Sequence, residues 1–179
     1  MRSGIWDWTR AKLLIALGVG IFTAPVWGAN AGRPGTVNYV EGDVTLNGAP
    51  LNGTSIGVAE LEPGQTLETH QGKAELLLTP GVFIRLDDSS QLRMITPGLT
   101  DTRVELTHGK AMLEATELLK GTHLGVLIAG STITVEKAGL YEFDADQPNL
   151  RVYDGEAWVI AGDRRVKVKK GRQTALAGT

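Results

Sequence analysis

The chain has 179 residues, enough for one ordinary domain. Hydrophobic residues make up 42% of it and glycine is frequent, with 23 residues, which indicates a globular protein with many tight turns. This composition excludes a disordered, collagenous or multi-span membrane chain. The absence of cysteine excludes a disulfide framework, a thiolate metal site and a cysteine nucleophile, and a lipoprotein anchor is not expected.

Residues 1–31 have the features of a signal peptide. Basic residues precede an apolar run, Leu13 to Trp27, which is about as long as the h-region of a secretory signal and too short to span a bilayer. Cleavage is predicted after Gly28 or after Ala31, and an uncleaved membrane anchor is the alternative. Cleavage would leave residues 32–179 as a single domain with a net charge of about −4, which lacks the dense basic face of a nucleic-acid binder. We therefore expect a periplasmic or secreted protein with no membrane span after cleavage.

A pattern that occurs four times dominates the rest of the chain. Each copy alternates apolar and polar residues, passes through a glycine, and resumes the alternation with Ala or Val. The copies are Val37–Leu46, Leu67–Leu76, Val104–Leu113 and Leu150–Val159, with their glycines at positions 42, 72, 109 and 155. Period-2 alternation is typical of strands with one buried face, and glycine tolerates the positive φ of a tight turn or bulge. Each copy is predicted to be a short hairpin or a sharply bent strand.

These units predict an all-β fold. One such unit cannot bury its own apolar face, so several must pack together. Because the copies are unevenly spaced, we expect a compact β-sandwich or β-roll with partly solenoid-like stacking, preceded by an N-terminal signal helix. Hairpin turns are predicted at Asn47-Gly48 and Gly130-Ser131, and a helical turn or two within Glu114 to Lys120.

No catalytic, cofactor or metal site is predicted. His70, His108 and His123 are isolated in the sequence, and Asp144-Ala145-Asp146 is only a fragment of a calcium loop, so turn and strand-end roles are favoured. The adjacent carboxylates of Asp87 and Asp88 are explained by a turn, although they resemble an acid/base pair. Ser131 follows a glycine, but the flanking motif of a serine nucleophile is absent. We expect a protein that is not an enzyme and needs no cofactor.

Two features leave binding roles open. The stretch Arg164 to Arg172 is basic, and as a strand it places Arg165, Lys167 and Lys169 on one face. A lysine-protected edge strand is the favoured interpretation, and contact with anionic lipid or polymer is the alternative. Trp158 is out of step with Ala157, so it either faces solvent, where with Tyr153 it could stack on sugars, or is buried.

The ordered set of motifs resembles the FecR domain family, named for a periplasmic regulator of ferric citrate uptake. The resemblance covers Gly35 to about Leu176, and it implies an exported β-scaffold without catalytic residues. Only twelve residues precede the apolar run, too few for the cytoplasmic anti-sigma segment of family regulators. The chain is therefore more similar to stand-alone exported FecR-domain proteins. The motifs are Gly35-Thr36-Val37, Val40 to Val44, Leu61 to Leu67, Gly72 to Leu76, Val104 to Ala111, Lys137 to Phe143, Val152 to Ala157 and Lys170 to Gln173.

Three functions are consistent with these features. The first is a non-enzymatic interaction or regulatory module in the bacterial envelope, which binds an envelope protein through a sheet face or by strand addition at an edge. The second, which rests on the resemblance alone, is an accessory regulator of iron or stress signalling across the membrane. The third is an envelope carbohydrate-binding protein. The identity of the partner does not follow from the sequence.

Overall fold

The structure, a computed structural model, describes residues 32–176, so the signal helix, the cleavage sites and the domain boundary at residue 31 lie outside the described residues. The described part is almost entirely β, which confirms the predicted fold class. No helix within it is long and apolar enough to cross a membrane. The elements are β1 (Thr36–Leu46), β2 (Ala49–Pro50), the 3-10 turn η1 (Gly53–Ser55), β3 (Thr66–Thr79), β4 (Val82–Leu86), β5 (Ser90–Pro97), β6 (Asp101–His108), β7 (Lys110–Ala115), β8 (His123–Ile128), β9 (Ser131–Val135), β10 (Gly139–Asp144), β11 (Asn149–Asp154), β12 (Glu156–Ala161), β13 (Arg164–Lys169) and β14 (Arg172–Ala175).

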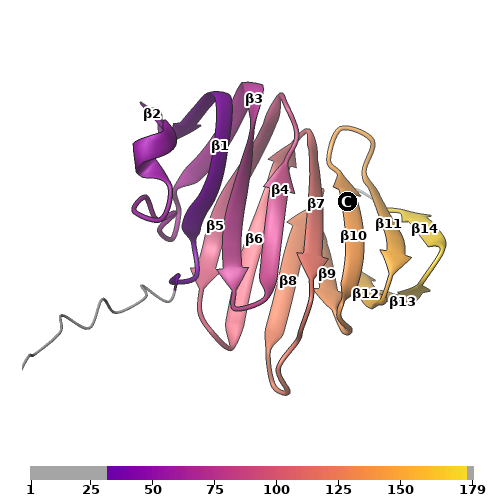
Figure 1. Ribbon diagram of the computed structural model, residues 1–179. Coiled ribbons are helices and arrows are strands. Elements are labelled where there is room, and N and C mark those ends of the chain that lie inside the picture. Colours follow the sequence, from indigo (N-terminus) through magenta and orange to yellow (C-terminus); the bar gives the residue numbers. More distant parts are fainter. Residues whose placement is uncertain (1–31, 177–179) are drawn as a thin grey trace, which may run out of the picture.

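A single sheet folds over on itself to form two layers (Figure 1). One layer runs β13-β12-β9-β8-β6-β5 and ends on the first part of β3, where Leu67 pairs with Leu92 of β5. The other starts on the last part of β3, where Leu76 pairs with Ile84, and runs β4-β7-β10-β11-β14. β1 pairs with β3 along both parts and joins the layers at one end of the body. β13 and β14 form the opposite end (Figure 1).

Strand alternation builds the core between the layers. In β4 and β10 the burial pattern alternates as the sequence predicts, so that Ile84, Tyr141 and Phe143 are fully buried while Arg85 is exposed. Burial of the apolar face of most strands is the main stabilising contribution, because that face leaves water.

The four repeated segments are bends and crossings rather than hairpins. β1 and β3 bend together where Gly42 and Gly72 pair, and a Cβ on Gly42 would lie 2.2 Å from the carbonyl oxygen of Gln71. At Gly109 (φ +73°) the chain passes from β6 in one layer to β7 in the other, and at Gly155 (φ +94°) from β11 to β12. The predicted bent strand is therefore observed at Gly42 and Gly72, whereas Gly109 and Gly155 join two strands in different layers, which matches neither predicted alternative. Glycine is required at these positions for two reasons. Some of them have a positive φ, which other residues avoid, and at others neighbouring backbone atoms leave no room for a Cβ.

The solenoid-like component is confined to one coil. β6 leads into β7 in the opposite layer, and the chain then returns as β8, which lies parallel to β6 with Arg103 opposite Gly125. Elsewhere the described strand pairs are antiparallel. A parallel pair needs such a crossover, and here β7 supplies it.

Two local predictions need correction. The helix predicted within Glu114 to Lys120 is absent, because Glu114 and Ala115 complete β7 and pair with β4 and β10 before the chain enters a loop. The turn predicted at Gly130-Ser131 lies one residue earlier, at Ala129-Gly130, where both residues have positive φ. The turn at Asn47-Gly48 is confirmed, also with two positive φ values.

Candidate functional site

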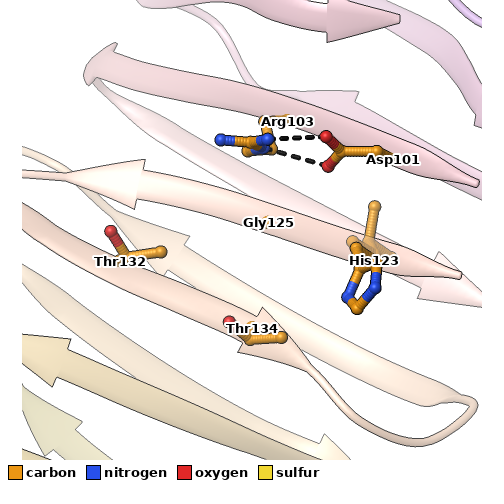
Figure 2. Close-up of a pocket in the computed structure, with 7 residues that line it drawn as sticks. Asp101, Arg103, His123, Gly125, Thr132 and Thr134 are labelled. Carbon is orange, nitrogen blue, oxygen red and sulfur yellow. Dashed lines mark hydrogen bonds and ion pairs between the residues drawn. The ribbon is translucent and has the colours of Figure 1, made fainter. Parts of the chain in front are cut away.

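A groove of about 320 Å³ crosses the outer face of β6, β8 and β9 (Figure 2). Strand register brings its residues together, because Asp101 lies opposite His123, Arg103 opposite Gly125, and Gly125 opposite Thr134. The groove is lined by Asp101, Arg103, His123, Leu124, Gly125, Thr132 and Thr134.

Gly125 forms the open floor of the groove. It lies in the middle of β8, where the neighbouring outward positions carry side chains, and it has none. A Cβ at this position would lie 3.2 Å from Cγ of Arg103. A glycine inside a strand often marks a close approach by another group. The missing side chain leaves room between Arg103 and the two threonines.

One ion pair dominates the electrostatics of the groove. Nε of Arg103 donates to Oδ1 of Asp101 at 2.9 Å and Nη2 donates to Oδ2 at 2.5 Å, the two-pronged contact drawn in Figure 2. The hydrogen bonds from Arg103 lower the pKa of Asp101, and the same contact raises the pKa of Arg103. The groove therefore presents a fixed cation and a fixed anion side by side, next to two hydroxyl groups.

This arrangement is suited to binding polar groups. Nucleophilic catalysis needs a hydroxyl or thiol within hydrogen-bond reach of a base. Within residues 32–176 the two carboxylate oxygens of Asp101 accept hydrogen bonds from Arg103, and the groove threonines make no side-chain hydrogen bond to His123. The exposed ion pair and the hydroxyls can exchange hydrogen bonds with a polar group that enters the groove.

The predicted turn residues occupy a corner between the layers and the end of the β10–β11 hairpin within one layer. Asp87 lies between β4 and β5, where it forms an ion pair with Lys73 at 3.2 Å. Oδ1 of Asp144 accepts hydrogen bonds from the backbone N–H groups of Asp146 and Gln147, so this carboxylate organises a strand-end turn. In the part of the chain that the structure describes, no group of three or more His, Cys, Asp or Glu residues is placed to hold a metal ion.

The histidines lie at two separate places. His123 lines the groove, whereas His70 and His108 lie beside a corner hollow of about 330 Å³. Nδ1 of His108 is 2.7 Å from Oδ1 of Asp146, and both side chains are exposed. Ser131 is fully buried at the start of β9 rather than displayed on a turn.

The two aromatic residues lie in different layers and do not form one platform. Trp158 of β12 faces outward and is half-buried, and its ring centroid lies 4.1 Å from the Arg165 guanidinium and 4.7 Å from the Lys167 ammonium. The Tyr153 hydroxyl, on β11, donates to Glu142 at 2.6 Å. The basic stretch containing Arg165 and Lys167 is confirmed as an edge strand, since β13 ends the strand order and pairs with β12.

The groove does not follow from the sequence. No local pattern singles out Asp101, Arg103, Thr132 or Thr134, because their strands are distant in sequence and meet through the parallel pairing of β6 with β8. A glycine within the apolar alternation of β8 was the available signal, since Gly125 interrupts an otherwise large-residue strand.

Comparison with known proteins gives a likeness of fold. No protein-family model matches the chain, and no curated protein matches it in sequence. Two crystal structures of a candidate anti-sigma factor from Parabacteroides distasonis ATCC 8503, at 1.65 and 2.50 Å resolution, superpose with a TM-score of 0.51 at 17% identity. The match covers 59% of this chain and 51% of that protein, so it spans about half of the length of the protein that it matches.

Proposed function

We propose that the chain is a non-enzymatic interaction module of the FecR-domain type, which acts in a regulatory assembly of the bacterial envelope. The groove on β6, β8 and β9 carries this proposal, because its fixed ion pair, hydroxyl groups and missing side chain at Gly125 are suited to receiving polar side chains of a partner. The likeness of fold to a candidate anti-sigma factor supports a regulatory role, as does the order of the FecR-like motifs.

Export is part of the proposal. It is motivated by the basic and apolar segments of residues 1–31. Mass spectrometry of protein recovered from the periplasm or medium is expected to find an N-terminus at Ala29 or Gly32. Protein retained in the cytoplasm with its leading segment intact would refute this part.

Site-specific cross-linking tests the interaction surface. A photo-reactive amino acid replaces Thr134 at the groove, and in the matched control it replaces Gln173, which lies on β14 in the other layer. We expect one discrete cross-linked envelope protein from position 134 and none from position 173. Substitution of Arg103 by alanine should then reduce the yield of that product, because it removes the cation of the groove.

The outcomes distinguish the candidate roles. A partner encoded with a sigma factor or receptor would make the chain an accessory regulator of transmembrane signalling. Absence of a discrete product at position 134, or equal products at both positions, would refute the groove as the interaction site. Carbohydrate binding is disfavoured at Trp158, because Arg165 and Lys167 already lie over its ring.

A further inference from the structure

In the described part of the chain, each end of the body carries a group of charges of one sign that have no ion-pair partner. Residues 34–72 contain five acidic residues and no lysine or arginine, and they form β1, β2, η1 and the start of β3 at one end (Figure 1). The carboxylates are Glu41, Asp43, Glu60, Glu62 and Glu68. Among residues 32–176 none of the five forms an ion pair.

The opposite end is basic. Six of the 18 lysine and arginine residues of the chain fall within residues 164–172, on β13 and the start of β14. Lys167 and Lys170 pair with Glu156 and Asp154. The other four, Arg164, Arg165, Lys169 and Arg172, form no ion pair within the described residues.

Between the ends, many charges are paired across neighbouring strands. Arg85 bonds Glu75 and Glu114, Arg93 bonds Glu105, and other pairs join neighbouring strands of the same layer. Opposite charges on adjacent strands are the ordinary way in which a sheet face uses charge. At the two ends, by contrast, most charges of the prevailing sign form no ion pair among the described residues.

Exposed apolar side chains accompany the unpaired charges at both ends. At the acidic end, the segment that hydrogen-bonds along β1 exposes Val58 by 76% and Ile56 by 39%. At the basic end, Val166 of β13 is 39% exposed and Ile160 of β12 is 37% exposed. Exposed apolar residues with polar residues around them are typical of interaction surfaces.

We propose that copies of this chain associate head to tail, with the basic β13–β14 end of one copy docked on the acidic β1–η1 end of the next. The two surfaces differ, so the contact is heterologous and repeats along the long direction of the body to form an open chain. Charge complementarity selects the orientation, because two like ends repel, and burial of the apolar residues supplies attraction. This inference does not depend on the partner of the groove.

Charge reversal at exposed, unpaired positions tests the proposal with little risk to folding. The basic-end variant carries Arg164→Glu, Lys169→Glu and Arg172→Glu, and the acidic-end variant carries Asp43→Lys, Glu60→Lys and Glu62→Lys. The control, Asp88→Lys, Glu117→Lys and Glu136→Lys, makes the same change in net charge as the acidic-end variant, at exposed positions outside residues 34–72 and 164–172. The full chain is expressed, and the form recovered is measured by sedimentation velocity over a range of concentration and salt.

Concentration-dependent association of the unmodified protein is expected at low salt, and it should weaken as the Debye length falls from about 30 Å at 0.01 M to about 8 Å at 0.15 M salt. Each end variant should associate about tenfold or more weakly, because three attractive charges become repulsive. The control should resemble the unmodified protein. An equimolar mixture of the two end variants should regain association, since an acidic end then meets a basic end again.

Several results would overturn the inference. One is an unmodified protein that stays monomeric at low salt at every concentration tested. Equal weakening in the control would assign the effect to net charge, and failure of the mixture to associate would show that the two ends do not meet. Circular dichroism of each variant confirms that it retains the strand spectrum, so a folding defect is not mistaken for lost contact.

Discussion

Tyr141 joins the two layers at one corner, and its substitution by phenylalanine isolates the role of a single buried hydroxyl. The side chain is fully buried. Its hydroxyl donates to the carbonyl oxygen of Lys137 at 2.5 Å and accepts from the backbone N–H of Glu156 at 3.0 Å. The carbonyl oxygen of Glu156 lies 3.1 Å from the same hydroxyl and is a second acceptor within reach. These groups belong to the connection between β9 and β10 and to the crossing at Gly155.

Removal of the hydroxyl leaves the N–H of Glu156 and the carbonyl of Lys137 without this partner. The cost of an unsatisfied buried group is about 1–3 kcal/mol. For a domain of this size, each kcal/mol lowers Tm by roughly 2–4 °C. Denaturant unfolding followed by circular dichroism measures the difference. Tyr153→Phe is the matched control, because the Tyr153 hydroxyl bonds an exposed carboxylate, and we expect a change within about 0.5 kcal/mol.

The same hydroxyl predicts a dependence on pH. Burial raises the pKa of Tyr141 to about 12 from an ordinary value of 10.0. The folded state therefore keeps a proton that the unfolded state loses, so the contribution to stability is complete below pH 10 and is lost as the pH rises towards 12. Tyr141→Phe should remove part of this alkaline loss. Equal stability of the two phenylalanine variants, or an unchanged alkaline loss in Tyr141→Phe, would refute the role assigned to the corner.

Three further predictions concern glycine, the groove and the sheet face. Gly155→Ala places a Cβ 2.0 Å from the Tyr141 hydroxyl at φ +94°, and it should lower the free energy of unfolding by more than about 4 kcal/mol. Gly162→Ala, in an open turn, should lower it by about 1–2 kcal/mol. Urea unfolding measures the difference between the two variants. Arg103→Ala should raise the pKa of Asp101 towards its ordinary value, as measured by a carboxyl ¹³C NMR titration, and an unchanged pKa would contradict the groove geometry. Arg85→Ala should lower the free energy of unfolding by about 0–1 kcal/mol for each of its two ion pairs, and by less at high salt. A loss of stability that does not change with salt would mean that packing, rather than charge, is affected.

Much of the fold was predictable because its determinants are local. Alternation over two residues reports which side of a strand is buried, and the burial of Ile84 and Leu86 around exposed Arg85 follows it directly. Glycine at Gly42, Gly109 and Gly155 reports a backbone conformation that other residues avoid, so the bends could be located in the sequence.

The helical turn predicted near Glu114 failed because tertiary contacts outweighed local preference. Glu114 pairs with Phe83 of β4 and Leu140 of β10, which extends β7 through a stretch rich in helix-forming residues. Ladder hydrogen bonds to two neighbours are available there only in the folded sheet.

The sequence by itself determined the strands, the bends and the opposite charge of residues 34–72 and 164–172, because each depends on residues that are close in the chain. Only the tertiary structure decided that Asp101, Arg103, Gly125 and Thr134 share one groove, and that the two charged stretches lie at opposite ends of the body. The physical reason is that strand neighbours are chosen by burial of the whole core. β8 reaches β6 only after the chain has crossed the other layer, and no local pattern specifies that register.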